Sequence, residues 1–368
     1  MVTHCQPLAI RTLELTCFRN YSQLQLQFEP GIQLVTGKNG TGKTNLLEAI
    51  YLQSVTRSFR TSSDKNIVQH EQRFFIDTGI WQLADEEMTV SCQWMLGRGK
   101  KILWNHVPVS RLSSHIGKLP VVIVLPEDVE MIREGGAERR KWMDLLLSQA
   151  DPDYLLEWIQ YERFLEQRNA LLKQLLEGKI LEKSELALWT TQLIRSGRVL
   201  HQKRKQFLES FQPVFQEQYK QISAGNETPG FTLKTTFQEN TAEEWNLQFE
   251  RLYSAERSLG RTMAGVHRED LEWELNGKPV RYFASQGQSK TFLLALRLAQ
   301  FYFLANQTGK IPVLLLDDVF DKLDQSRMEQ IARLLDPIPA QIFITDTDID
   351  RMKRHFHGAS VHSIVCPI

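Results

Sequence analysis

A glycine-rich segment near the N-terminus has the residue types and the spacing of a phosphate-binding loop. Residues 37–44 read GKNGTGKT and match the pattern G-x-x-x-x-G-K-[ST] at every fixed position. A strand-like stretch precedes the segment and a stretch with helical spacing of apolar residues follows it, which is the context that such a loop requires. The expected phosphate ligands are Gly37, Lys38, Asn39, Gly40, Thr41, Gly42, Lys43 and Thr44.

Each part of this loop has a chemical task. Glycines let the backbone curl until several N–H groups point at one phosphate, and the start of the following helix adds partial positive charge. Lys43 is expected to reach the β- and γ-phosphates, and the Thr44 hydroxyl to bind Mg²⁺. A plain glycine-rich turn is the alternative, and the loop by itself does not separate kinases, GTPases and ATPases.

Two carboxylates follow an apolar stretch in the last third of the chain. Residues 313–316 read VLLL, which is typical of a buried strand, and Asp317 and Asp318 come directly after them. We expect Asp317 to hold Mg²⁺, directly or through water, and Asp318 to orient or deprotonate an attacking water. The alternative for Asp317 is a helix N-cap, a position that Asp favours.

A second anion site is predicted upstream of this acidic pair. Ser285, Gly287 and Gln288 stand in the segment SQGQ, just before a long apolar stretch with helical spacing. A serine hydroxyl, a glycine backbone and a helix N-terminus together suit an anion, although Ser-x-Gly is also common capping chemistry. The order of loop, signature and acidic strand is that of ATP-binding-cassette ATPases, in which the signature covers the γ-phosphate bound by a partner subunit.

The elements that must position these motifs change character along the chain. Short apolar strands alternate with helices in the first and last thirds, which predicts a sheet covered on both faces. Residues from about 137 to 222 instead predict long amphipathic helices, with breaks at Gly178 and Gly197. Asn276-Gly277 predicts a hairpin whose later strand covers residues 278–283.

Composition excludes several classes of protein. The 368 residues are 42% hydrophobic and 24% charged, with 44 basic and 44 acidic side chains. This neutrality excludes a bulk polyanion binder, so any nucleic-acid binding must rest on local basic patches. The four cysteines form no C-x-x-C pair and no apolar run is long enough to span a membrane, so we expect a cytoplasmic protein without a membrane partner.

Several separated motifs resemble the RecF family, the bacterial DNA replication and repair ATPases related to SMC and Rad50 proteins. They are FRNY at 18–21, TNLLEAI at 44–50, RSFR at 57–60, PED at 126–128 with Arg139 and Arg140, and GVHRED at 265–270 with Asn276-Gly277 and SQGQ at 285–288. The resemblance covers nearly the whole chain. The short helical middle lacks the long coiled coil and C-x-x-C hook of Rad50 proteins, which favours RecF.

The resemblance implies an α/β fold: an ABC/SMC-type P-loop ATPase head with an inserted, mainly helical domain. We divide the chain into residues 1–125, the N-terminal part of the ATPase domain; 126–255, the insertion; and 256–368, the C-terminal ATPase part with the signature and the acidic strand.

The same resemblance implies an ATP-dependent DNA-binding protein of replication, recombinational gap repair and the SOS response. ATP, with Mg²⁺, would join two copies on gapped duplex DNA or near single-strand/double-strand junctions. Slow, DNA-dependent hydrolysis would release them. RecR-type and RecO-type proteins would be its partners in loading a recombinase.

Roles for single residues follow from the resemblance by position. Lys43 and Thr44 bind the nucleotide, Asp317 holds the metal, Ser285, Gly287 and Gln288 act across the dimer, and Asp324 is the dimer-loop acid. Arg19 is expected near the α-phosphate, with a surface charge on a hairpin as the alternative. Asp318 stands where many cassette ATPases carry Glu, and this shorter side chain suits a slow switch. Residues 346–348 contain no histidine at the usual switch position, so no γ-phosphate sensor is identified.

Local basic runs are the candidates for DNA binding. The main run lies in the helical middle and gives Arg198, Lys203, Arg204 and Lys205. Two others are residues 351–355 and the hairpin tip at 98–101, and a solvated helix or hairpin surface is the alternative for each. No base-reading motif is present, so binding would be directed to phosphates and sensitive to salt.

Other functions fit the phosphate loop less well. A P-loop phosphotransferase would need a substrate lid and no SQGQ signature, and a transporter-type ATPase usually has a much shorter gap between loop and signature. A non-hydrolysing scaffold would not need Lys43, Thr44 and both acids after the apolar strand. The alternative that stays open is another ABC/SMC-type ATPase or a phosphotransferase that does not act on DNA.

Overall fold

The computed structural model describes residues 4–133, 135–179, 183–223, 227–320, 325–356 and 359–363. The chain folds into two compact units, each made of separate segments. Unit 1 consists of Met1–Val129, Glu217–Asn226 and Lys290–Ile368, and unit 2 consists of Glu130–Gln216 and Glu227–Ser289. Unit 2 is thus inserted between parts of unit 1.

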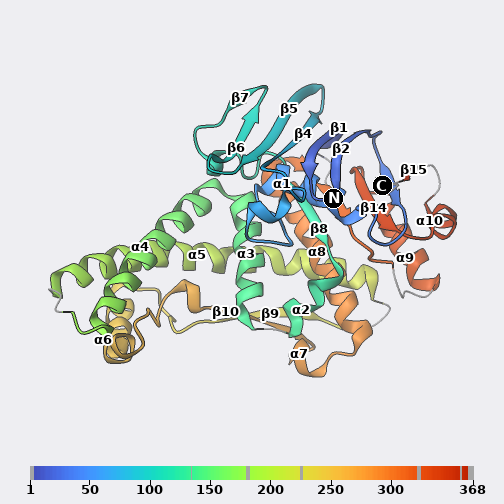
Figure 1. Cartoon of the computed structure of the whole chain (residues 1–368). Coiled ribbons are helices and arrows are strands. Elements are labelled where there is room, and N and C mark those ends of the chain that lie inside the picture. The colour runs from blue at the N-terminus through green and yellow to red at the C-terminus, as the bar shows by residue number, and fades with distance from the viewer. Residues whose placement is uncertain are drawn as a thin grey trace. The chain divides into compact units, whose positions relative to one another are not determined.

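A mainly antiparallel, seven-stranded sheet is one of two sheets in unit 1 (Figure 1). Its strands are β1 (Gln6–Phe18), β2 (Tyr21–Gln27), β4 (Phe74–Leu83), β5 (Glu86–Met95), β6 (Gly99–Trp104), β7 (Val107–Pro108) and β12 (Lys310–Ile311). They pair in the order β12-β1-β4-β5-β6-β7, with β2 also on β1, and only β12 pairs in parallel. Burial alternates along β4, as period-two apolar patterns require.

The second sheet of unit 1 is parallel. Its strands, in spatial order, are β15 (Ser360–Ser363), β3 (Ile32–Thr36), β14 (Ile342–Asp346), β13 (Val313–Leu316) and β8 (Val121–Val124). Every neighbouring pair runs parallel. All residues of β13 and β8 are buried, as continuous apolar runs in a covered parallel sheet should be, so the strand predicted at 313–316 is confirmed.

Helix α1 (Lys43–Val55) lies between these two sheets, where it contacts β4 and β5 of one and β8 and β14 of the other. Buried residues occur around its whole circumference. A helix that is buried on all sides is a core helix. Because α1 begins at Lys43, the predicted phosphate loop is attached to a fully packed element.

The last third of the chain adds helices α8 (Gln286–Thr308), α9 (Gln325–Leu335) and α10 (Ile349–His355). Within unit 1, Arg297 of α8 donates to the two carboxylate oxygens of Asp128 at 2.9 and 2.5 Å, and both residues are buried. Asp128 comes from the PED motif, so this motif fastens α8 to the end of β8. No helix in the described ranges is both long enough and apolar enough to cross a membrane.

Unit 2 combines helices with a small antiparallel sheet. Its elements are α2 (Glu130–Arg133), α3 (Gly136–Ala150), α4 (Pro152–Leu176), α5 (Lys183–Ile222, which continues into unit 1), α6 (Ala242–Leu259), α7 (Val280–Phe283), β9 (Pro229–Lys234), β10 (Asp270–Leu275) and β11 (Lys278–Pro279). The sheet order is β11-β10-β9. Asp151 caps α4 and Thr241 caps α6 through their side chains. The long helices predicted for the middle of the chain are confirmed.

Of the two predicted helix breaks, one is confirmed and one is wrong. Gly178 has a φ of +83° just after α4 ends. Gly197 lies inside α5, where a Cβ would come within 2.6 Å of the ring of Trp245. Trp245 is fully buried, so Gly197 permits a close approach of this indole and does not change the direction of the backbone.

The hairpin predicted at Asn276-Gly277 is confirmed, but the strand predicted over residues 278–283 is shorter than expected. β11 ends at Pro279, and residues 280–283 form the short helix α7. Proline has no N–H to donate to the ladder, which favours an end to the pairing with β10 at this point.

The units and the predicted domains divide the last third of the chain differently. Residues 256–289 group with unit 2, because β10 pairs along its whole length with β9. Helix α6 separates these two strands in the sequence, so their pairing had no local signal.

Candidate nucleotide-binding and DNA-binding sites

The predicted phosphate loop joins β3 to α1, and its conformation depends on glycine. Gly40 and Gly42 have φ values of +82° and +111°, in the region that disfavours side chains. At Gly42 a Cβ would also lie 2.5 Å from the hydroxyl oxygen of Tyr21. That hydroxyl donates to the carbonyl oxygen of Gly42 at 3.0 Å. Tyr21, from the FRNY motif, thus fixes the point where the loop becomes a helix.

Lys43 is a buried cation whose neighbours are backbone groups. Its ammonium donates to the carbonyl oxygens of Gly37 and Lys38 at 2.9 and 3.2 Å, and the residue is 5% exposed. No carboxylate of the described residues forms an ion pair with it. Carbonyl oxygens only partly offset the loss of water around an ammonium. An anion bound in the loop would supply the missing negative charge. The loop is also where the sequence predicts a phosphate.

Thr44 and Asp317 come together although they are 273 residues apart. The Thr44 hydroxyl donates to Asp317 Oδ1 at 3.2 Å, and the Thr345 hydroxyl donates to the same oxygen at 2.7 Å. Burial raises the pKa of Asp317, and the hydrogen bonds from Thr345 and Thr44 offset only part of this effect. A divalent cation bound here would hold the carboxylate ionised. The two predicted metal ligands are therefore neighbours.

The donor atoms of this pair suit Mg²⁺. Hydroxyl and carboxylate oxygens are hard ligands, and Mg²⁺ in phosphate sites usually takes one or two of them from the protein and the rest from phosphate and water. Thr44 and Asp317 provide such oxygens directly beside Lys43. The described residues contain no group of three or more His, Cys, Asp or Glu that could hold a metal ion.

Asp318, the predicted general base, has an unusual backbone conformation. Its φ is +45°, in the left-handed region that non-glycine residues adopt at a cost. Its N–H donates to the Thr345 hydroxyl oxygen at 2.9 Å. Thr345 therefore holds both acidic residues in place, and the sequence had not singled it out. The catalytic role of Asp318 stays a prediction.

Arg19 forms hydrogen bonds with other residues of unit 1. Its Nε and Nη2 donate to the two carboxylate oxygens of Glu48 at 2.8 and 2.5 Å, and its Nη1 donates to the carbonyl oxygen of Asn66 at 2.5 Å. Glu48 is fully buried on α1 and also accepts from Ser58. Arg19 thus ties the first hairpin to α1, and its predicted approach to an α-phosphate stays a prediction.

A second series of contacts joins the same motifs. Asn20 donates to the carbonyl oxygen of Thr41 at 3.0 Å, and Asn45 donates to Asn20 at 2.8 Å. Arg60 donates to Asn45 at 2.8 Å. FRNY therefore contacts the phosphate loop, and both FRNY and RSFR contact the TNLLEAI segment at the start of α1. Glu48 and Asn45 were not predicted as site residues. Their position within the TNLLEAI motif was the signal that could have identified them.

The segment after β14 forms a turn. The Asp348 N–H donates to Asp346 at 2.7 Å, and Arg351 donates to Asp346 at 2.6 Å. Asp348 also caps α10. These contacts assign no γ-phosphate sensor. Asp324, the predicted dimer-loop acid, lies outside the described residues.

The signature segment belongs to unit 2, whereas the phosphate loop belongs to unit 1. The Gln288 N–H donates to Ser285 Oγ at 3.1 Å, and the Ser285 N–H donates to Gln288 Oε1 at 2.7 Å. This reciprocal pair is a capping box at the start of α8. The capping alternative for Ser285 is therefore confirmed. The action of Ser285, Gly287 and Gln288 on a second copy stays a prediction.

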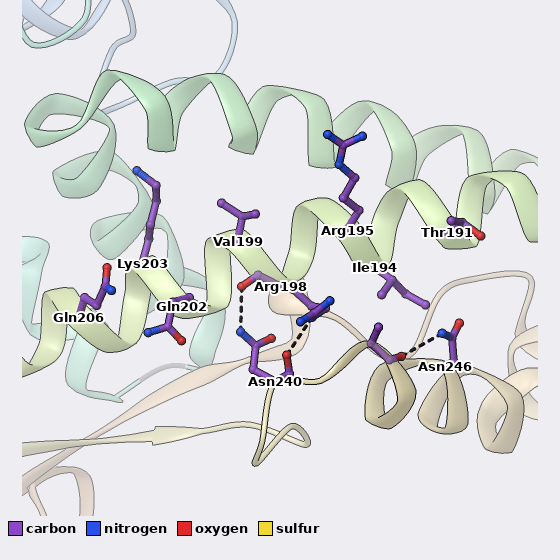
Figure 2. Close-up of a pocket in the computed structure, with 11 residues that line it drawn as sticks. Thr191, Ile194, Arg195, Arg198, Val199, Gln202, Lys203, Gln206, Asn240 and Asn246 are labelled. Carbon is purple, nitrogen blue, oxygen red and sulfur yellow. Dashed lines mark hydrogen bonds between the residues drawn. The ribbon is translucent and has the colours of Figure 1, made fainter.

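A groove of about 650 Å³ lies on unit 2 between α5 and the segment that leads into α6 (Figure 2). Its lining includes the cations Arg195, Arg198 and Lys203 and no acidic side chain. Arg198 donates to the carbonyl oxygen of Asn240 at 2.8 Å, and Figure 2 shows its side chain directed toward this loop. Lys203 pairs with Asp151. Two of the four predicted DNA-binding residues thus line one groove.

The prediction that Arg204 contacts DNA is wrong. The residue is fully buried and pairs with Asp144 at 2.6 Å and with Glu269 at 2.8 Å. Burial by itself would raise the pKa of Glu269, but the hydrogen bond from His201 and the charge of Arg204 outweigh it and lower the pKa. Consecutive residues of a helix point in different directions, so a basic run includes the buried face. Lys205, by contrast, is half-exposed and donates to the carbonyl oxygen of Gln238 at 3.2 Å.

Some cations of the other two basic runs also form ion pairs. Lys100 pairs with Asp64 at 2.6 Å, and Arg351 pairs with Asp346 at 2.6 Å. Lys101 is exposed. A solvated surface was the alternative to DNA binding for these runs. It describes only part of each run, because other residues of the run form ion pairs.

Comparison with known proteins gives the family. Residues 9–361 match the family model of the RecF/RecN/SMC N terminal domain. The DNA replication and repair protein RecF of Cytophaga hutchinsonii is 37% identical over 350 residues, which cover 95% of this chain and 92% of that protein. The chain belongs to the RecF family. The RecF protein of Parabacteroides distasonis is 39% identical over 342 residues, covering 92% of this chain and 91% of that relative.

Solved RecF structures have the same fold. The recombination mediator protein RecF in a structure with ATPrS, from the RecFOR pathway, gives a TM-score of 0.90 at 31% identity and covers 98% of both chains. A RecF structure with ATP gives 0.88 at 30% identity and covers 99% of both chains. An Smc head domain from Pyrococcus furiosus gives 0.55 at 16% identity, which shows the fold alone. The predicted ABC/SMC-type α/β fold and the resemblance to RecF are confirmed.

Proposed function

We propose that this RecF-family chain is an ATP-controlled DNA-binding protein of DNA replication and recombinational gap repair. The observation that carries the proposal is the environment of Lys43. This buried ammonium lies in a phosphate loop, donates to two backbone carbonyl oxygens, and stands beside the hydrogen-bonded pair Thr44 and Asp317. Membership of the RecF family selects DNA repair among the uses of such a loop.

The side chains around the loop would each act on the nucleotide. The loop N–H groups and Lys43 bind the phosphates of ATP, and Thr44 and Asp317 hold Mg²⁺. When bound, the metal ion neutralises phosphate charge. Asp318 orients the attacking water, and Thr345 holds Asp318 through its N–H. A short carboxylate on a constrained backbone suits a slow switch, so we propose slow, DNA-stimulated hydrolysis.

ATP is proposed to join two copies of the chain. In each copy the Ser285 hydroxyl and the start of α8 would face the γ-phosphate held by the other copy, because the partial positive charge of a helix N-terminus favours an anion. Release of that phosphate removes the charge that both copies share. The copies then separate, so the nucleotide state sets the lifetime of the dimer on DNA.

DNA is proposed to lie along the groove of unit 2. Arg195, Arg198 and Lys203 line it with no acid among the lining residues, and Lys205 is half-exposed on the same helix. Such a surface binds phosphates without reading the bases. We propose gapped duplex and single-strand/double-strand junctions as the DNA substrates. RecR-type and RecO-type proteins are the proposed partners, since RecF structures come from the RecFOR pathway; the proposed setting is the cytoplasm during the SOS response.

Sedimentation with ATP, ADP or no nucleotide tests the ATP switch. The wild-type chain should dimerise with ATP only. Lys43→Ala removes the buried ammonium, so ATP affinity should fall by about 100-fold and the dimer should be lost. Ser285→Arg should bind ATP with wild-type affinity but stay monomeric, because a bulky cation blocks closure against the partner. Wild-type dimerisation by Lys43→Ala would falsify the switch, and loss of ATP binding by Ser285→Arg would place the signature in its own subunit's site.

Salt titrations with gapped duplex DNA test the groove. The double variant Arg195→Gln with Arg198→Gln removes two cations, so the slope of log K against log salt should fall by about two units. Lys141→Gln on α3 is the control, because Lys141 is an exposed lysine of the same unit that does not line the groove. An unchanged affinity and slope in the double variant would remove the groove from the DNA-binding surface.

A further inference from the structure

The PED motif at residues 126–128 contains two adjacent carboxylates whose environments are opposite. Asp128 is buried, and Arg297 donates to both of its oxygens at 2.9 and 2.5 Å. Glu127 is exposed, and no cation of the described residues forms an ion pair with it. Asp128 therefore has a structural role, whereas its contacts leave the carboxylate of Glu127 unexplained.

Strand pairing places Glu127 at the carboxyl end of the parallel sheet, close to the predicted metal ligand Asp317. β8 and β13 pair in parallel as far as Val124 and Leu316, and the Asp317 N–H donates to the carbonyl oxygen of Val124 at 3.0 Å. Glu127 is three residues beyond Val124, so their Cα atoms lie at most about 11 Å apart. Ligands of parallel sheets bind beyond the carboxyl ends of the strands, which is where Glu127 lies.

The turn that carries Glu127 is fixed by hydrogen bonds. Residues Pro126–Val129 form a 3₁₀ turn. The Asp128 carboxylate accepts from the Leu125 N–H at 3.1 Å, and the Asp128 N–H donates to the Leu125 carbonyl oxygen at 3.1 Å. Proline restricts the backbone at the first position of the turn. Glu127 is thus presented from an ordered backbone, so little further backbone entropy is lost when its carboxylate meets a ligand.

Negative charge accumulates at this end of the sheet. Burial is the largest cause of the raised pKa of Asp317, and the charges of Asp318 and Glu127 raise it further. The Glu127 carboxylate is therefore close enough for its charge to act on Asp317. Like charges repel, and a divalent cation between them replaces this repulsion by attraction.

The arrangement favours a contact with the cation through water. No three His, Cys, Asp or Glu of the described residues form a group that could hold a metal ion, so Glu127 does not complete a set of direct ligands. Mg²⁺ in phosphate sites usually keeps several waters, and outer hydrogen-bond partners strengthen its binding. An exposed glutamate on an ordered turn suits the role of such a partner.

We propose that Glu127 supplies a further carboxylate for the Mg²⁺ ion of the nucleotide site, which it contacts through water. The inference rests on the proposed binding of ATP at Lys43 and Thr44. It gives the two acids of the PED motif separate tasks, because Asp128 fixes the turn and Glu127 adds negative charge beside the ion. That charge opposes ATP alone and favours ATP with Mg²⁺, so Glu127 makes the site selective for the metal complex.

Calorimetric titration with ATPγS, which resists hydrolysis, measures this selectivity in EDTA and in excess Mg²⁺. The ratio of the two dissociation constants reports how strongly the metal ion and the nucleotide support each other's binding. In Glu127→Gln the ratio should fall by about tenfold or more, as is usual when an outer partner of a metal ion is removed. Binding with Mg²⁺ should become weaker, whereas binding in EDTA should stay the same or become tighter.

Glu29→Gln is the matched control for the loss of one negative charge. Glu29 is also an exposed glutamate of unit 1, but it precedes β3 and so lies toward the amino end of the parallel sheet. Its ratio of dissociation constants should equal that of the wild type. Glu127→Asp keeps the charge and should restore most of the ratio. Both Glu127 variants should unfold at the urea concentration of the wild type, because the side chain is exposed.

The outcomes distinguish this inference from the function on which it rests. Failure of the wild type to bind ATPγS, or equal binding with and without Mg²⁺, would remove the proposed nucleotide site and the inference together. A wild-type ratio in Glu127→Gln would overturn the inference alone. Equal weakening in EDTA and in Mg²⁺ would also overturn it, since a role toward the metal ion requires the two constants to change differently.

Discussion

Unit 1 and unit 2 each contain a buried basic side chain, and the two are satisfied in opposite ways. Lys43 in unit 1 donates to the carbonyl oxygens of Gly37 and Lys38. Arg204 in unit 2 pairs with the carboxylates of Asp144 and Glu269. A carbonyl carries only a partial charge, whereas a carboxylate neutralises a guanidinium. Lys43 therefore keeps a net positive field for an incoming anion, and Arg204 does not.

This difference separates a ligand-binding cation from a structural one. The network of Arg204 also includes the Tyr154 hydroxyl and the carbonyl oxygen of Val266, so all four of these partners of the guanidinium lie within unit 2. Tyr161, which donates or accepts a hydrogen bond with His267, extends the polar core beside it. The GVHRED motif at 265–270 thus acts here in the packing of unit 2.

The largest expected effect is on the stability of unit 2. Arg204→Met leaves Asp144 and Glu269 as buried carboxylates without their cation, so the free energy of unfolding should fall by about 3–5 kcal/mol. Urea denaturation followed by circular dichroism measures the loss. Lys205→Met is the matched control, and it should change stability by less than about 1 kcal/mol because Lys205 is half-exposed and has a carbonyl partner.

Lys43→Ala tests the other half of the comparison, that the cation of unit 1 is not needed for stability. Its unfolding free energy should stay within about 1 kcal/mol of the wild type, although its ATP affinity falls by about 100-fold, because the ammonium has only carbonyl partners among the described residues. A loss as large as that of Arg204→Met would mean that both cations are structural, and the comparison would fail. Little loss in Arg204→Met would show that unit 2 does not depend on its ion pairs.

A pH-dependent effect is expected at a buried carboxyl of unit 1 that has no cation partner among the described residues. Asp77 on β4 accepts from Gln53 at 2.5 Å, and its Oδ2 has no hydrogen-bond partner among the described residues. Burial raises the pKa of Asp77 well above its usual value, against the hydrogen bond from Gln53. The folded chain therefore keeps a proton that the unfolded chain releases above about pH 4. Stability attributable to Asp77 should decrease as pH rises from there, by up to about 1.4 kcal/mol per pH unit, until the folded-state pKa is passed.

Asp77→Asn tests this pH dependence. The amide cannot titrate, so the variant should become more stable relative to the wild type with each step upward in pH. Unfolding curves at several pH values between 5 and 8 measure the difference. Asp85→Asn, an exposed carboxyl at the end of the same hairpin, should show no such trend. A constant difference between Asp77→Asn and the wild type would mean that Asp77 is ionised in the folded chain.

The sequence predicted the loop between β3 and α1 and the acidic end of β13 because their determinants are local. A loop that binds a phosphate needs its glycines, Lys43 and Thr44 within one segment of eight residues. The predicted metal ligand Asp317 likewise follows directly after an apolar strand. Thr345 was missed because nothing in its own segment indicates that its hydroxyl reaches Asp317. The bond depends on β14 pairing beside β13, which is a long-range event.

The orientation of the basic run on α5 was not predictable from the sequence for a related reason. Arg204 and Lys205 are neighbours in sequence, yet one is fully buried and the other is half-exposed. The face of a helix that becomes buried depends on the elements that pack against it. The acidic partners of Arg204 are Asp144 on α3 and Glu269, the residue just before β10. Gly197 was interpreted as a break for the same reason, because only the folded unit places Trp245 against it.

The amino-acid sequence by itself determined the phosphate loop, the acidic strand end, the signature and the RecF-type α/β fold, since short-range spacing and apolar periodicity encode these features. Only the tertiary structure decided which buried charges are neutralised within the fold. It also decided which basic residues face a groove, and that Glu127 and Asp317 lie at the same end of the parallel sheet. Burial and ion pairing depend on segments that are distant along the chain, so a linear pattern of residue types does not contain them.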